Sequence, residues 1–313
     1  MHKKSILLTA LAKRLSLPHQ QKGIQLMLGA TLFFALTSGL SKWLGRHFPT
    51  LELVFFRNVV GVLFIGYSIW KRPLQQKSGG KLGLLVFRGV VGTLSLYMLF
   101  YSIQVLGLGR ASTYQYTYPI FLALLSWLLL GEKLRFQEWL AIGIGFLGIL
   151  FVFRPDLDMS VHDHALGLGV AILTAVSYLS IRHLGHHYDV RAIILSFMLS
   201  GIIMPLASMA GGELFPEITD NFLIGRFILP LSPYHWLGFL ALGLTALIGQ
   251  KMLTESFTYD KAGRIAAIGY SNILFSSVLG IIMGEAFPSF PMLIGMLLII
   301  MGGVLIALSK ASK

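Results

Sequence analysis

The sequence predicts an all-α polytopic membrane protein, and three observations support this fold class. Hydrophobic residues make up 55% of the 313 residues, charged residues only 12%, and the mean hydropathy is +0.76, whereas soluble domains carry about a quarter charged residues. Apolar runs of about 17 to 25 residues, the length that spans a bilayer, recur along the chain. Lys and Arg fall mainly between these runs, so the net charge of +12 indicates membrane topology rather than nucleic-acid binding.

Ten segments have the length and composition of a transmembrane helix. Turn-forming residues separate many of them, for example Pro49, the Gly79-Gly80 pair, Pro233 and Pro288. Residues 1–22 carry five Lys or Arg residues around a short apolar run, so we expect a cytosolic tail lying partly in the membrane interface. The predicted spans cover residues 24–45, 51–70, 82–103, 111–130, 136–153, 165–184, 192–212, 235–257, 264–284 and 291–309.

The distribution of basic residues predicts that both termini lie in the cytosol. With the N-terminus inside, 17 Lys and Arg residues fall on the cytosolic side and five fall outside. This asymmetry follows the positive-inside rule. Three basic residues, Arg57, Arg88 and Lys251, fall inside predicted spans.

Two halves of the chain repeat the same plan. The pairs Gly109-Arg110 and Gly263-Arg264 are 154 residues apart, and Leu28-Gly29 and Leu168-Gly169 are 140 apart. Each repeat would hold five helices, and an odd number inverts the second repeat relative to the first. The predicted organisation is a tail (1–22), a first repeat (23–153), an external linker (154–164), a second repeat (165–309) and a short cytosolic tail (310–313).

Several motifs carry a resemblance to a known family. They are TYPIFLALLSWLLLGEKLRFQEWLAIGIGFLGILFV, the Gly-Glu pairs that end the fourth and ninth spans, and the Gly-rich fifth and tenth spans. The chain resembles the EamA type of the drug/metabolite transporter superfamily. LELVFFRNVVG and FRGVVGTLSLYMLFYSI are similar to a subset that includes S-adenosylmethionine uptake carriers. The resemblance implies a central cavity lined by the first, third, fourth, sixth, eighth and ninth helices.

Polar groups inside a span are costly in lipid and usually face a protein interior, so each is a candidate functional residue. Lys251 and Glu255 are i, i+4 neighbours in the eighth span, and the 154-residue shift places them opposite Tyr97 and Tyr101 in the third. We expect these four residues to face the cavity and bind substrate, with Glu255 as a candidate for proton coupling. The alternative is a Lys251–Glu255 salt bridge that fixes helix packing.

The fourth and ninth spans carry matching polar stretches. On a continuous helix Tyr114 and Tyr118 share one face, Tyr116 points nearly opposite, and the proline after Tyr118 is expected to kink the helix. The repeat places Tyr270 opposite Tyr116 and Asn272 opposite Tyr118. We expect Tyr114, Tyr118, Tyr270 and Asn272 to bind substrate by stacking or hydrogen bonds. The alternative for tyrosines in a span is an interfacial belt.

The two arginines inside spans are assigned gating or structural roles. Arg57 could extend toward the outer interface, pair with Glu52, or hold a substrate carboxylate; because the resemblance makes the second helix peripheral, we favour a structural or gating role. Arg88 falls nearly opposite Tyr97 on the helical wheel and groups instead with Gly92, Ser95 and Ser102, so we expect it to serve helix packing.

Glu132 and Glu285 follow glycine at helix ends, where a carboxylate is unfavourable unless it serves the next helix. We expect them to cap that helix, with a structural or gating role. The glycines of the fifth and tenth spans are expected to pack these two helices together. They do not form a nucleotide-binding loop, because no strand precedes them.

Several kinds of chemistry are not expected. The chain has no Cys, which excludes disulfides and thiolate metal sites. The histidines of His162-Asp163-His164 and of His186-His187 lack metal-ligand spacing and fall on opposite sides of the predicted membrane, so we expect no metal and no cofactor. No catalytic His, Asp and Glu constellation lies at one level of the bilayer, so we do not expect an enzyme.

The expected function is secondary transport of a small polar organic metabolite by alternating access. Both charge signs beside tyrosines favour a zwitterionic substrate, either amino-acid-like or S-adenosylmethionine-like. The alternatives are an exporter of drugs or of other metabolites such as nucleosides, vitamins or sugars, a non-transporting membrane subunit, and a membrane-embedded enzyme. We expect a monomer or weak homodimer in a bacterial cytoplasmic (inner) membrane, in contact with lipids and binding no nucleic acid.

Overall fold

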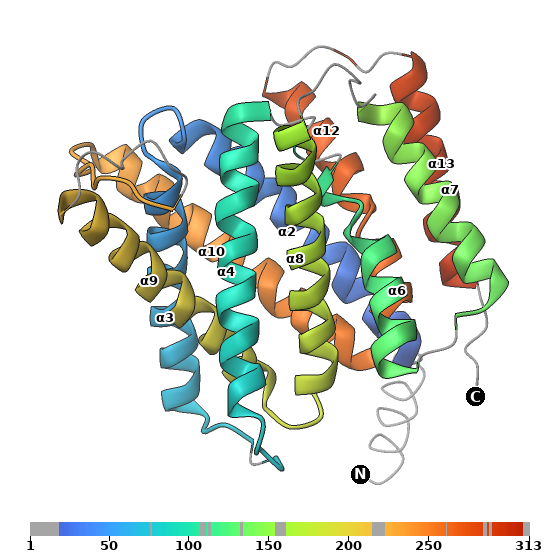
Figure 1. The fold of residues 1–313 in the computed structure, drawn as a ribbon, viewed down its shortest axis with the longest axis horizontal. Coiled ribbons are helices and arrows are strands. Elements are labelled where there is room, and N and C mark those ends of the chain that lie inside the picture. The colour runs from blue at the N-terminus through green and yellow to red at the C-terminus, as the bar shows by residue number, and fades with distance from the viewer. Residues whose placement is uncertain are drawn as a thin grey trace, which may run out of the picture.

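A computed structural model describes residues 19–75, 77–106, 111, 114–131, 134–153, 161–214, 223–260, 262–283, 287 and 290–308. Over these residues the regular structure is helical, and no strand occurs among them. Figure 1 shows the arrangement of the helices. They are α2 (His19–Leu44), α3 (Thr50–Lys71), α4 (Leu82–Leu106), α6 (Tyr118–Leu130), α7 (Phe136–Phe153), α8 (Val161–Leu184), α9 (Val190–Leu214), α10 (Pro233–Tyr259), α11 (Ala262–Ile268), α12 (Ser271–Ile282) and α13 (Phe290–Leu308).

The helices have the length and composition of membrane spans. In the described part of the chain, seven helical stretches are long and apolar enough to cross a bilayer, the last of them running through α11 and α12. The apolar stretches within α6, α7 and α13 are shorter than these seven. Large apolar side chains such as Trp70, Leu129 and Leu297 are exposed on the outside of the bundle, as expected where lipid replaces water. The prediction of a polytopic, all-helical membrane protein is confirmed at this level.

Helices far apart in the sequence pack in pairs. The helix α2 packs against α10, α4 against α8, α3 against α9, and α7 against α13. In Figure 1 the pair α7 and α13 forms one edge of the molecule, and the pair α3 and α9 forms the opposite edge. The central helices α2, α4, α8 and α10 therefore surround the middle of the bundle.

Close contacts between helices depend on glycine. A side chain at Gly148 would collide with the backbone carbonyl of Gly295, and one at Gly302 with the backbone of Ala141 and Gly145. These contacts join α7 to α13, as predicted for the glycines of the fifth and tenth spans. Gly143 differs from these glycines, because nothing lies within contact distance of a side chain placed there.

Two further glycines face methionines on neighbouring helices. A side chain at Gly29 of α2 would meet the methyl group of Met252 of α10, and one at Gly169 of α8 would meet that of Met98 of α4. Methionine is flexible and fills irregular gaps between helices. The pairs α2–α10 and α4–α8 thus use the same kind of contact.

The turns after α2 and α8 have the same backbone hydrogen bonds. In the first, the N–H of Gly45 donates to the carbonyl of Ser41 at 2.8 Å; in the second, the N–H of Gly185 donates to that of Ile181 at 2.9 Å. Both turns lead directly into the next helix.

Asp189 stabilises the start of α9. Its carboxylate accepts hydrogen bonds from the backbone N–H groups of Arg191 and Gln75, each at 2.9 Å, and pairs with the Arg191 side chain at 2.8 Å. Burial alone would raise the pKa of Asp189, but these hydrogen bonds lower it to about 2. The connection between α3 and α4 is thereby fixed to the turn that precedes α9.

Candidate functional site

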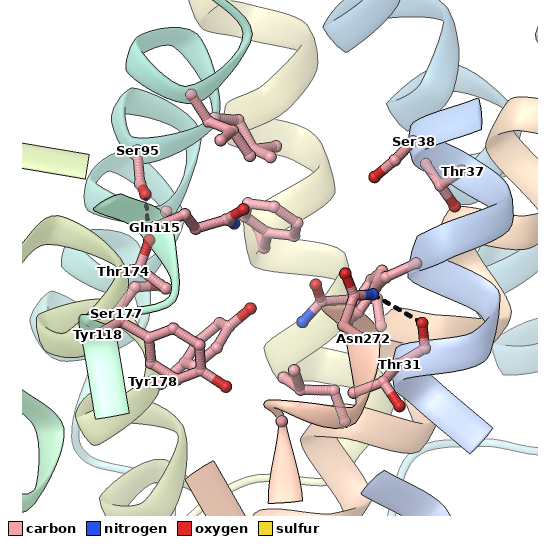
Figure 2. Close-up of a pocket in the computed structure, with 18 of the residues that line it drawn as sticks. Thr31, Thr37, Ser38, Ser95, Gln115, Tyr118, Thr174, Ser177, Tyr178 and Asn272 are labelled. Carbon is pink, nitrogen blue, oxygen red and sulfur yellow. Dashed lines mark hydrogen bonds between the residues drawn. The ribbon is translucent and has the colours of Figure 1, made fainter. Parts of the chain in front are cut away.

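A cavity lies in the middle of the helix bundle. It contains about 900 Å³ of empty space, part of it open to solvent. Its walls come from α2, α4, residues 115–118, α8, α10 and the junction of α11 with α12, with Arg57 from α3 and Phe197 from α9. These are the helices that the resemblance predicted, with α3 and α9 in addition. Figure 2 shows polar side chains reaching into the space from α2 on one side and from α4 and α8 on the other.

Two helices are interrupted where they reach the cavity. The fourth predicted span turns at Tyr116 and Thr117 before α6 begins at Tyr118, with the N–H of Thr117 donating to the carbonyl of Tyr114 at 3.0 Å. The ninth turns at Gly269 and Tyr270, between α11 and α12. Irregular backbone at membrane depth is tolerated where it is buried in protein or lines a cavity. Both interruptions satisfy this condition, since residues on each line the cavity.

Neutral hydrogen-bonding groups make up most of the polar wall. The hydroxyl groups of Ser95 and Thr174 are 2.7 Å apart, and the Asn272 amide donates to the carbonyl of Thr31 at 2.7 Å (Figure 2). Gln250 donates to the hydroxyl of Thr254 at 3.2 Å. These bonds orient the side chains and leave further donors and acceptors facing the cavity.

Aromatic rings form another part of the wall. The ring of Tyr118 meets that of Tyr178 edge to face, with centroids 5.2 Å apart, and Tyr178 in turn contacts Phe257 at 5.6 Å. Tyr118 and Tyr178 both line the cavity and lie next to one another in Figure 2. Such rings present flat surfaces and hydroxyl groups to a bound molecule.

Two arginines line the cavity and share one aromatic ring. The guanidinium carbon of Arg88 lies 4.1 Å from the centre of the Phe197 ring, and that of Arg57 lies 5.5 Å from it. Both residues are buried, with relative exposures of 1% and 3%. Within the described part of the chain, Arg88 Nε and Nη1 and Arg57 Nη1 have no hydrogen-bond partner. Most buried polar groups are satisfied in folded proteins, so these atoms are unusual.

The predicted site residues divide into two groups. Arg57, Arg88, Tyr118 and Asn272 line the cavity. Tyr114 instead packs on Gly167, and Tyr270 packs on Gly145, so the contacts of these two tyrosines lie between helices. The helical-wheel prediction for the fourth span differs from the structure because the chain turns at Tyr116, and this turn brings Tyr116 to the cavity beside Tyr118.

The expected cavity-facing placement of Lys251 and Glu255 differs from the structure. Neither residue lines the cavity; their side chains are 55% and 31% exposed and pair at 4.0 Å. The neighbouring Gln250 is buried and does line the cavity. Successive helical residues are rotated by about 100°, so the predicted face of α10 was wrong by one position.

The predicted face of α4 also differs from the face that lines the cavity. Tyr97 is buried next to Ser208, with the two hydroxyl groups 3.5 Å apart, and neither Tyr97 nor Tyr101 is among the lining residues. Arg88 lines the cavity together with Ser95, which the helical wheel placed on its face. The grouping of Arg88 was therefore right, but its face is the one that lines the cavity.

Glu132 and Glu285 lie outside the described residues, so their predicted capping role stays a prediction. At the start of α7 the cap comes from Glu138, whose carboxylate accepts the backbone N–H of Arg135 at 2.8 Å. Among the described residues no group of three or more His, Asp and Glu side chains could hold a metal ion.

The resemblance placed the sixth helix, α8, at the cavity, but the sequence analysis named no lining residue of α8 and did not include α9. Thr174, Ser177 and Tyr178 of α8 line the cavity, as does Phe197 of α9. The signal was present, because Thr174 and Ser177 recur at helical spacing in the sixth span and Ser177 lies 140 residues after Thr37 of the first.

The fold and the cavity define a helical membrane transporter, and the chain belongs to the EamA-like transporter family. The family model matches residues 21–154. The drug/metabolite transporter resemblance is thereby confirmed.

Among the relatives, an uncharacterized transporter of Helicobacter pylori is 30% identical over 93% of this chain and 96% of its own length. The pseudopaline exporter CntI of Pseudomonas aeruginosa is 28% identical over 94% of this chain and 98% of its own. Solute carrier family 35 member G1 of Mus musculus is 25% identical over 84% of this chain and 72% of its own length. A solved crystal structure with 16% identity shares the fold, with a TM-score of 0.73 over 91% of this chain and 97% of that one.

Proposed function

We propose that the protein is a secondary transporter that carries a small polar organic metabolite by alternating access. The observation that carries this proposal is the central cavity, where two interrupted helices meet neutral polar groups, aromatic rings and two arginines. Interrupted helices at the substrate site are a recurring feature of secondary transporters. The sequence contains no ATP-binding motif, so the energy would come from a substrate gradient, from exchange or from protons.

Ten spans arranged as two inverted repeats of five would supply the alternating motion. Support comes from contacts that recur when residues of α2 are shifted by 140 and those of α4 by 154. The contact of Met98 with Gly169 then matches that of Met252 with Gly29. The same shifts match Ser95 of α4 with Gly249 of α10, and Phe34 of α2 with Thr174 of α8. Both matched pairs are in contact: Ser95 forms a hydrogen bond with Thr174, and a side chain at Gly249 would meet Phe34. Two halves built alike in opposite orientations can exchange conformations to open the site to either side.

The proposed topology places both termini in the cytosol of a bacterium, with the protein in the inner membrane. The connection between α3 and α4 and the turn after α8 would then be cytosolic. These two segments contact each other; for example, the Lys77 ammonium donates to the carbonyl of Gly185 at 2.7 Å. Their basic residues follow the positive-inside rule.

The sequence suggests an amino-acid-like or an S-adenosylmethionine-like metabolite, and the cavity favours the first, because Arg57 and Arg88 line it and repel a net positive charge. The cavity offers hydrogen bonds from Ser95, Thr174 and Asn272 and flat surfaces on Tyr118 and Tyr178. The similarity to a pseudopaline exporter favours export as the direction of transport.

Counterflow in proteoliposomes tests the transport function. We expect wild-type protein to accumulate at least one labelled amino-acid-like, nucleoside or S-adenosylmethionine-like compound against preloaded unlabelled compound. Ser177→Phe should abolish this accumulation, because Ser177 lines the cavity and the larger side chain fills it. Leu147→Phe is the matched control, since Leu147 is 52% exposed on the outside of α7. Equal accumulation by both variants would place the substrate route elsewhere.

A further inference from the structure

We propose that Arg57 and Arg88 together bind a carboxylate group of the transported metabolite, so that the substrate is an organic anion. This inference rests on the proposed transport function and specifies its substrate class. It reassigns two residues for which the sequence favoured structural or gating roles. Four features of the cavity carry it: the position of the two cations, their unpartnered atoms, the absence of lining acids, and the neutral groups around them.

The two guanidinium groups lie near the same aromatic ring. Arg57 comes from α3 and Arg88 from α4, and both approach the ring of Phe197, at 5.5 Å and 4.1 Å. Their carbon atoms are therefore no farther apart than the sum of these two distances. Two cations held this close repel each other unless an anion lies near both. A shared ring offers each of them a cation–π contact but no negative charge.

The donor atoms of these arginines are not consumed by the protein. Arg88 Nε and Nη1 and Arg57 Nη1 are buried and have no hydrogen-bond partner among the residues that the structure describes. A guanidinium presents its N–H groups as a rigid fork that matches the two oxygens of a carboxylate. A bound carboxylate would satisfy these donors and neutralise charge in one step.

Acidic side chains that could play this role are missing from the cavity wall. Among the lining residues that the structure describes, none is Asp or Glu. Glu52 precedes Arg57 by five residues on α3, but its carboxylate accepts the backbone N–H of Ile228, outside the cavity. No ion pair joins it to Arg57 in the part of the chain that the structure describes. We therefore infer that the negative charge comes with the substrate.

The charges of the lining residues determine which substrates we expect to bind best. The other polar groups among the cavity's described lining residues are neutral, including Gln115, Tyr178 and Asn272. On this described lining, an amino group of the substrate would find hydroxyl, amide and aromatic groups but no carboxylate. We therefore rank di- and tricarboxylates first, zwitterions with one carboxylate second, and compounds of net positive charge, which include those with a sulfonium group, last.

Ligand-dependent thermal stability of the purified full-length protein tests this ranking. The probes are citrate, succinate and glutamate, compared with glutamine, succinamide and putrescine at equal ionic strength. We expect the first three to raise the melting temperature in proportion to their charge, and putrescine to have no effect. Salt alone is the reference, because simple screening would act alike for all anions.

Three variants connect the effect to the two arginines. In Arg57→Gln and in Arg88→Gln, the citrate concentration needed for the same rise in melting temperature should increase at least tenfold. Each substitution removes half of the charge at the site. Arg46→Gln, at an exposed position near the end of α2, is the matched control and should keep wild-type protection. If a glutamine variant fails to fold, Arg57→Lys and Arg88→Lys keep the charge but lose the fork, and they should bind more weakly than wild type.

The outcomes separate this inference from the transport function. Protection by carboxylates that both glutamine variants lose supports the inference. Protection or counterflow with neutral or cationic compounds, and none with carboxylates, overturns it and leaves the carrier function standing. Carboxylate binding that survives both substitutions also overturns it. If no probe protects and none is transported, the inference and the proposed function fail together.

Discussion

Three arginines are buried in the described part of this molecule, and the environment of Arg264 differs from that of Arg57 and Arg88. Arg264, at the junction of α7 and α11, is 1% exposed and pairs with Glu138 at 2.7 Å and with Asp260 at 3.0 Å. Arg57 and Arg88 line the cavity and are 3% and 1% exposed. The guanidinium group of each lies near the phenyl ring of Phe197.

The difference shows that burial alone does not identify a functional charge. A buried ion pair with both partners present is part of the scaffold, and removing one partner leaves an uncompensated charge. A buried cation without an acidic partner lacks that structural explanation, and in a cavity it is available to a ligand. The predictions below test this distinction, beginning with the largest expected effect.

Breaking the Arg264 pair should destabilise the fold. Glu138→Gln leaves Arg264 with Asp260 as its remaining acidic partner and weakens the cap of α7, so we expect a loss of about 3 kcal/mol in the free energy of unfolding. The measurement is thermal or denaturant unfolding of the purified protein in detergent. Glu213→Gln, at an exposed position near the end of α9, is the control. Equal stability of both variants would show that the pair is dispensable.

Removing a cavity arginine should have the opposite effect on stability. Arg88→Met deletes a buried charge for which the described residues supply no acidic partner, so the free energy of unfolding should stay unchanged or rise by about 1 kcal/mol. Transport should nevertheless be lost, because the substrate site is incomplete. Unfolding and counterflow are measured on the same preparation. A loss of stability as large as that of Glu138→Gln would place Arg88 in the scaffold.

Lys251 provides a third case, a cation in a span that is neither buried nor in the cavity. Its side chain is 55% exposed and lies 4.0 Å from Glu255. Exposed pairs contribute about 0 to 1 kcal/mol, so Lys251→Gln should change stability by less than about 0.5 kcal/mol and leave carboxylate counterflow intact. Loss of counterflow in this variant, or a changed pH dependence in Glu255→Gln, would restore the substrate and proton roles that the sequence suggested.

A small effect that depends on pH is expected at Asp189, whose partner Arg191 lies near the end of the bundle. The pKa of Asp189 is lowered to about 2 from the ordinary 3.8. A lowered pKa stabilises the fold above pH 4, and this contribution, below about 1 kcal/mol, is lost as the pH falls toward 2. Asp189→Asn should be slightly less stable than wild type at pH 7 and similar to it at pH 2. Unfolding measured across this range checks the sign.

The scaffold was predictable because it follows from composition and spacing. The apolar runs gave helices in the expected places, and Gly148 and Gly302 pack α7 against α13 as their spacing suggested. The cavity was harder to predict, because a one-residue error rotates a helix face by about 100°. Lys251 and Glu255 were expected at the cavity, but the neighbouring Gln250 lines it, and a helical wheel does not show the turn at Tyr116.

The unpartnered state of Arg57 and Arg88 could not be predicted either. It depends on where α3 places Glu52 and on which side of α9 carries Phe197, and both follow from packing between helices.

The positive charge of the cavity belongs to one half of the chain only. Under the proposed repeat, the counterparts of Arg57 and Arg88 are Phe197 and Leu242, which are apolar. After a gene duplication, one copy could thus change its ligand preference while the glycine and methionine contacts of both copies stayed fixed. Selectivity in such a protein can evolve through a few side chains, without any change in the parts that make it move.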